Sequence, residues 1–113
     1  MEKECTYEDF LKVDMRVGEI ERALPFPKAR KPAYQLWINF GEEIGIKKSS
    51  AQVTERYQVE DLIGRKVIAV VNFPEKQIAN FMSEALVLGI DSVAGGVSLL
   101  QIEHDTPLGT RVY

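Results

Sequence analysis

The stretch AYQLWINF, from Ala33 to Phe40, alternates between two kinds of side chain. One face carries the apolar or aromatic residues Tyr34, Leu36, Ile38 and Phe40. The other face carries Gln35 and Asn39, with Trp37 as the one large aromatic among polar neighbours. A period of two predicts a strand with one buried face and one face open to solvent or to a ligand.

Other stretches extend this strand into a sheet. VIAVVNF, from Val67 to Phe73, is almost continuously apolar and β-branched, which predicts a strand buried on both sides. Gly18 falls inside a strand expected from Met15 to Leu24, where an interior glycine indicates a bulge or a barrel bend. Three more strands are expected at Ile46–Val53, Ser83–Ile90 and Val97–Ile102.

Helical patterns are short. Thr6 is a candidate N-cap for a helix ending near Asp14, and Val59–Gly64 predicts a single helical turn. The segment Pro25–Pro32 is a proline-rich loop, and Glu75–Phe81 has no clear period. Five or six strands without a long helical crossover predict an all-β fold, a small antiparallel barrel with short flanking helices.

Length and composition limit the alternatives. The chain has 113 residues and 12.8 kDa, which predicts one domain, residues 1–113. A net charge of −3 argues against a surface that attracts nucleic acid everywhere. The acidic N-terminus lacks an apolar leader, and no run approaches the roughly 20 apolar residues of a membrane span. We therefore expect a cytoplasmic protein without membrane insertion.

Catalytic and metal-binding patterns are not found. A single cysteine, Cys5, and a single histidine, His104, make a disulfide or a zinc site within one chain implausible. No phosphate-binding glycine loop occurs, and no glycines flank Ser83 as in a nucleophile elbow. The adjacent Glu42 and Glu43 are typical of a solvated turn. We predict no catalytic residue, no metal and no cofactor.

Basic residues suggest one binding surface. They lie in the proline-rich loop and on the strand expected at 46–53, which would have to lie nearby: Lys28, Arg30, Lys31, Lys47 and Lys48. Such a patch could meet phosphates, and Tyr34 and Trp37 could stack on bases for about 1–3 kcal/mol each. The alternative is that the lysines only keep the surface soluble while Tyr34 lies in the core.

Apolar residues around Pro74 suggest another surface. These are Phe73, Ile78, Phe81 and Met82, in a segment expected to be a loop, with Lys76 nearby. If they are exposed, they form an adaptable apolar patch for extended polypeptide. The alternative is that they belong to the core, as in most proteins.

Several segments together resemble the CsaA proteins, export-related chaperones within the tRNA-binding-domain family. They are DMRVGEI (14–20), ARKPAYQLWINFG (29–41), IKKSSAQVT (46–54), VEDLIGRKVIAVVNF (59–73) and SEALVLGI (83–90). The resemblance implies an OB-fold barrel with short terminal extensions, a homodimer and no catalysis.

One motif departs from the wider family. Where tRNA-binding members typically carry Lys-Met-Arg-Gly-Val-Glu-Ser, residues 77–83 are QIANFMS, and only Ser83 matches. The loss of basic residues at Gln77 and Ala79 weakens a phosphate site and favours polypeptide. We therefore expect a holdase for unfolded or precursor proteins, with Phe73, Lys76, Ile78, Phe81 and Met82 as its peptide site. The alternative is tRNA or structured RNA, bound by Lys28, Arg30, Lys31, Lys47, Lys48 and Ser83.

Overall fold

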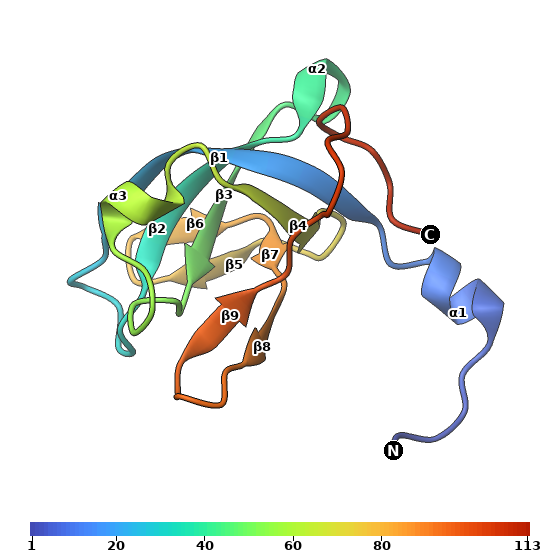
Figure 1. Ribbon diagram of the computed structural model, residues 1–113, viewed down its shortest axis with the longest axis horizontal. Coiled ribbons are helices and arrows are strands. Elements are labelled where there is room, and N and C mark those ends of the chain that lie inside the picture. Colours follow the sequence, from blue (N-terminus) through green and yellow to red (C-terminus); the bar gives the residue numbers. More distant parts are fainter.

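The computed structural model describes all residues from Met1 to Tyr113, and its centre is a curved antiparallel sheet (Figure 1). The sheet has five strands in the order β3-β2-β1-β4-β7. Their bounds are β1 Met15–Pro25, β2 Tyr34–Asn39, β3 Ile46–Ala51, β4 Lys66–Val70 and β7 Leu86–Val87. The two edge strands approach each other, and the backbone N–H groups of Glu84 and Ala85 donate to the carbonyl of Lys48. This contact closes the sheet into an OB-fold-like barrel, which confirms the predicted all-β class.

Two small hairpins complete the strands. β5 (Lys76–Ile78) pairs with β6 (Phe81–Ser83), and β8 (Gly89–Asp91) pairs with β9 (Val97–Leu99). The segment 75–81, which has no period in the sequence, is therefore mostly hairpin rather than loop. The single strand predicted from Ser83 to Ile90 is wrong, because the chain there is divided among β6, β7 and β8. β4 also stops at Val70, and Phe73 is exposed beyond it.

Three short helices lie at the ends of strands. α1 (Tyr7–Leu11) begins with the expected Thr6 cap, whose hydroxyl accepts from the Asp9 amide. α2 (Gly41–Ile44) and α3 (Val59–Leu62) are single turns. α2 occupies a segment that the sequence suggested only as a turn. None of the helices is long and apolar enough to cross a membrane.

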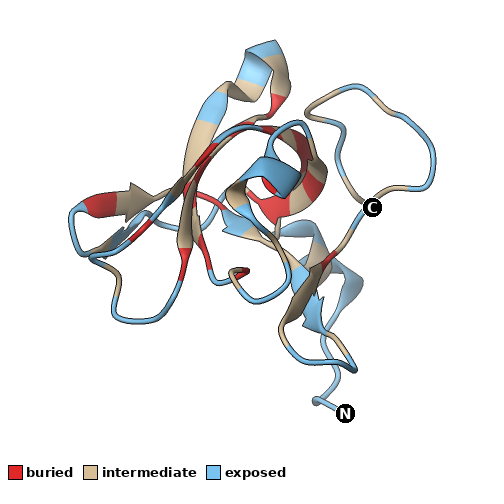
Figure 2. Cartoon of the chain, turned by 60° about the vertical axis from the view of Figure 1, so that its left-hand side comes forward, coloured by how far each residue is buried: buried red, intermediate tan, exposed pale blue.

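Buried residues concentrate inside the barrel (Figure 2). The apolar face predicted for β2 is confirmed, since Leu36, Ile38 and Phe40 are almost completely buried. Val67 and Ala69 of β4 and Leu62 of α3 join the same cluster. A second, smaller cluster contains Phe26, Ala33 and Phe81 and lies under the β5–β6 hairpin.

Gly18 allows β1 to pass closely over the core. A Cβ at this position would lie 2.6 Å from Ile38 Cγ2 and 2.7 Å from Phe40 Cε1. The register of β1 against β2 shifts between Ile20 and Arg22, so the irregularity is three positions away from the glycine. The sequence therefore located a special position, and the structure assigns it to close packing.

The C-terminal segment pairs with the first residues of β1, before the point at which β1 begins to pair with β2. The Gly109 amide donates to the Val17 carbonyl, and the Val112 amide donates to the Met15 carbonyl. Arg16 donates two hydrogen bonds to the Asp14 carboxylate, at 2.6 and 3.2 Å, and a third to the Gly109 carbonyl at 2.9 Å. This segment is therefore held against the barrel, although Tyr113 at its end is exposed.

This arrangement predicts an acid-sensitive contribution to stability. The hydrogen bonds from Arg16, together with the charges of Arg16 and Arg111, hold the pKa of Asp14 below its ordinary value of 3.8, against the opposing effect of burial. A lowered pKa stabilises the folded state above pH 3.8, and this contribution is lost as the pH falls further. Asp14→Asn should lower the free energy of unfolding by about 1 kcal/mol at pH 7. Urea titrations of the wild-type protein and the variant at pH 7 and at pH 2.5 measure this difference in the free energy of unfolding. An equal difference at both pH values would contradict a stabilising role of the ionised Asp14 carboxylate.

Candidate ligand groove

The β5–β6 hairpin and the proline-rich loop enclose a groove beside β3. Its first hollow has a volume of about 560 Å³ and its second about 250 Å³. Both hollows are lined by Ser50, Gln52, Lys76 and Ile78, so they are neighbouring parts of one groove. β3 supplies Ser50, the segment after it supplies Gln52, and β5 supplies the other two residues.

The first hollow is cationic. Lys28, Arg30 and Lys31 line it from the loop between β1 and β2, and Lys76 lines it from β5. None of these four side chains takes part in an ion pair within the chain. Their charges are therefore available to an anionic group of a ligand.

Two predicted basic residues lie elsewhere. Lys47 and Lys48 do not line either hollow. Successive side chains of a strand point to opposite faces, so Lys47 shares a face with the buried Ser49 while Lys48 lies on the other. The Lys48 ammonium lies 5.2 Å from the centre of the Phe81 ring. The five basic residues thus do not form one patch.

The second hollow is more apolar. Phe73, Pro74, Ile78 and Leu86 line it, and the side chains of Phe73 and Leu86 are about half exposed, at 47% and 48%. Sequence reasoning missed Pro74 and Leu86, and it also missed Ser50 and Gln52. The only signal available for the last two was the polarity of the segment 46–53, in which five of eight residues are lysine, serine or glutamine.

Phe81 differs from the expectation of an exposed patch. It is 6% exposed, and its ring meets the rings of Phe26 and Trp37 edge-on at 5.5 and 5.6 Å between centroids. Phe81 therefore packs the β5–β6 hairpin against Phe26 and against Trp37 of β2. Met82 is partly exposed but lines neither hollow. Of the predicted peptide residues, the structure brings Phe73, Lys76 and Ile78 together in the groove.

Polar positions of the hairpin are used within the fold. The Ser83 hydroxyl accepts from the Ser50 amide at 3.1 Å and donates to the Ala85 carbonyl at 3.4 Å. The Gln77 side-chain amide donates to the carbonyl of Ala79, which has a positive φ of 52° at the tip. Ser83 lines the second hollow, but its hydroxyl already has partners.

The expected stacking residues are also engaged. The Tyr34 hydroxyl donates to the Tyr57 carbonyl at 2.8 Å, and its ring packs against the main core. Trp37 lies between Phe81 and Arg22, whose guanidinium carbon is 4.6 Å from the indole centre. The structure thus gives Tyr34 the core position that was the alternative reading of the sequence.

A small β-barrel with a groove that is cationic at one end and apolar at the other is a binding domain. A family model described as a putative tRNA binding domain matches residues 15–111, so the chain belongs to this family. The crystal structure of the CsaA chaperone protein from Picrophilus torridus is 52% identical, with a TM-score of 0.91 over 97% of this chain and all of that one. CsaA from Bacillus anthracis is 50% identical, with a TM-score of 0.91 over 98% of this chain and all of that one.

A longer relative shares only this region. The methionine–tRNA ligase of Methanocaldococcus jannaschii is 33% identical over 101 residues, which are 89% of this chain and 15% of the ligase. The chain therefore spans a small part of that enzyme.

Proposed function

We propose that this protein is a non-catalytic chaperone that holds unfolded or precursor polypeptides in the cytoplasm and keeps them available for export. In this proposal the chain acts as one OB-fold domain with short terminal extensions. Binding to unfolded chains lowers the concentration of free, aggregation-prone chains by mass action, and this needs no nucleotide or metal.

The groove carries the proposal. An extended polypeptide can place an apolar side chain against Phe73 and Leu86 while a carboxylate further along meets Lys76 and the loop cations. The apolar contact favours binding of sequences that are normally buried, since these are exposed only in unfolded clients. The similarity to the two CsaA chaperone structures supports the same conclusion.

A matched pair of variants tests this function. Phe73→Ser should raise the protein concentration needed for half-suppression of aggregation of denatured citrate synthase at least fivefold, because it removes the largest exposed apolar side chain of the groove. Light scattering measures the effect. Ile63→Ser is the control, since Ile63 is similarly exposed, at 53%, but follows α3 outside the groove. Equal loss in both variants, or in neither, would count against the groove.

RNA is the second candidate ligand. The cationic hollow favours it, and so does membership of a family described as tRNA binding. A single strand or tRNA would place phosphates against Lys28, Arg30, Lys31 and Lys76. In this alternative the apolar hollow has no defined role.

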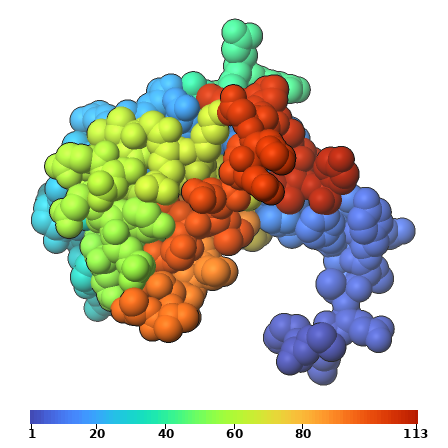
Figure 3. Space-filling view, in the orientation of Figure 1, coloured from blue at the N-terminus to red at the C-terminus, as the bar shows by residue number.

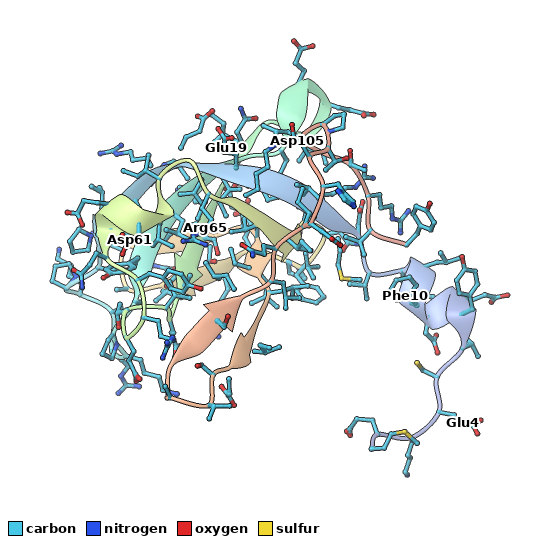
Figure 4. The ribbon with its side chains drawn as sticks, viewed as in Figure 1. Glu4, Phe10, Glu19, Asp61, Arg65 and Asp105 are labelled. Carbon is cyan, nitrogen blue, oxygen red and sulfur yellow. The ribbon has the colours of Figure 1, made fainter.

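We also propose a homodimer. α1 extends away from the barrel in the space-filling view (Figure 3), and Figure 4 places Phe10 on this helix. Tyr7 and Leu11 of α1 are 70% and 43% exposed, and Tyr113 at the other terminus is exposed as well. An apolar surface on a projecting element is best covered by a second copy. Two symmetry-related grooves would then add avidity for long clients.

A further inference from the structure

Residues 72–75 form the connection that carries Phe73 and Pro74, which line the apolar hollow of the ligand groove. The connection follows β4, which ends at Val70, and precedes β5, which begins at Lys76. No backbone amide or carbonyl of these four residues forms a hydrogen bond within the chain. Something other than backbone pairing must therefore hold Phe73 at the groove.

The Asn72 side chain forms two hydrogen bonds that join this connection to the rest of the chain. Its carbonyl oxygen accepts from the Asp14 amide at 2.9 Å, and its amide nitrogen donates to the Lys12 carbonyl at 2.7 Å. Both partners lie in the linker of residues 12–14, between α1 and β1 (Figure 1). Asparagine suits such a bridge because its side-chain amide both accepts and donates.

This side chain takes the place of a backbone pairing. The register of β1 against β4 pairs Met15 with Val70. Continued pairing would place Asp14 opposite Val71, and the Val71 amide does donate to the Asp14 carbonyl at 2.9 Å. In a hydrogen-bonded antiparallel pair the two residues exchange both bonds, but the Asp14 amide donates to Asn72 Oδ1 instead. The backbone after Val71 thus leaves the sheet while the side chain still holds it.

The linker that receives these bonds is itself held in place. Arg16 donates two hydrogen bonds to the Asp14 carboxylate, and Arg111 Nε lies 3.6 Å from the same group. Arg111 also donates to the Leu11 carbonyl at 2.6 Å. A tether restricts movement only if its other end is fixed, and these contacts from β1 and the C-terminal segment fix it.

We infer that Asn72 is a positioning residue of the ligand groove, whose side-chain amide ties the connection to the linker of residues 12–14 and so fixes Phe73 for client binding. Asn72 lines neither hollow, so it acts through Phe73 and not on the client. A ligand that must order a mobile segment loses affinity by the entropy of ordering, and a segment fixed in advance avoids that loss. The inference rests on the proposed chaperone function.

Asn72→Ala removes both hydrogen bonds, and combination with Phe73→Ala tests its role. Fluorescence anisotropy of a fluorescein-labelled nonapeptide, a leucine pair flanked by glutamates, measures the affinity. Asn72→Ala alone should weaken binding about fivefold, because the connection that carries Phe73 becomes mobile. In a protein that already carries Phe73→Ala, the same change should alter the affinity less than about 1.5-fold, since no ring is left to position.

Asn39→Ala is the matched control. The Asn39 side chain also forms two hydrogen bonds, donating to the Glu21 carboxylate at 2.8 Å and accepting from the Gly41 amide at 2.9 Å. It lines neither hollow of the groove. Urea denaturation should show a loss of stability in both asparagine variants, whereas Asn39→Ala should change the peptide affinity less than about 1.5-fold.

An unchanged affinity of Asn72→Ala, an equal loss in Asn39→Ala, or a fivefold loss that recurs in the Phe73→Ala background would overturn the positioning role. Each of these results leaves the chaperone function standing. Failure of the wild-type protein to bind the peptide would overturn both proposals. Backbone ¹⁵N relaxation of the free wild-type protein should give the Phe73 amide an order parameter of about 0.85, and a value below about 0.6 would overturn the tether.

Discussion

Replacement of Phe81 by alanine is expected to lower the free energy of unfolding by about 3 kcal/mol, the low end of the range for a buried phenylalanine. The ring is nearly inaccessible and meets two other aromatic rings and the Lys48 ammonium. Its removal leaves a cavity between the hairpin and β2 that Phe26 and Trp37 fill poorly. Urea denaturation followed by tryptophan fluorescence measures the change, since Trp37 is the single tryptophan and borders the site.

Phe73→Ala is the matched control for this stability effect. Its side chain is 47% exposed, so the loss should stay below about 1 kcal/mol. A stability loss of similar size in both variants would contradict the division between a buried, supporting Phe81 and a solvent-exposed Phe73. The comparison also explains why a client-binding assay on a Phe81 variant reports mainly on folding.

If RNA is the ligand, the triple variant Lys28→Ala, Arg30→Ala, Lys31→Ala should weaken binding of single-stranded RNA about 30- to 100-fold at low salt. Each cation that meets a phosphate releases counterions, so the slope of log affinity against log salt should also become shallower by about 2. These three side chains line one hollow and have no ion pair in the chain, so they are free to contact phosphates. Filter binding across a salt series measures both quantities.

A variant with the same change in net charge is the control. Lys3→Ala, Lys12→Ala, Lys47→Ala removes three cations that do not line the groove. It should change the RNA affinity less than fivefold. If both triple variants lose affinity equally, RNA responds to overall charge and the cationic hollow is not its site.

The contrast between Phe73 and Phe81 shows why sequence reasoning recovered only part of the site. Both residues are phenylalanines near the same proline, and composition cannot tell which one turns inward. The hairpin decides this, because β5 pairs with β6 and turns Phe81 toward Phe26. Lys47 and Lys48 show the same limit, since adjacency in the sequence separates side chains in a strand rather than grouping them.

A different reason explains why the sequence did not predict four residues of the groove, Ser50, Gln52, Pro74 and Leu86. They are ordinary residues whose role comes from meeting at one place, although they lie in separate segments of the chain.

Local sequence signals determined the all-β class, the buried face of β2, the capped first helix and the special position of Gly18. These features depend on local geometry, namely the alternation of a strand and the space available to a Cβ. The tertiary structure decided which apolar side chains line the groove and which cations share a hollow. Such features depend on contacts between segments distant in sequence, and no local pattern encodes the distance between them.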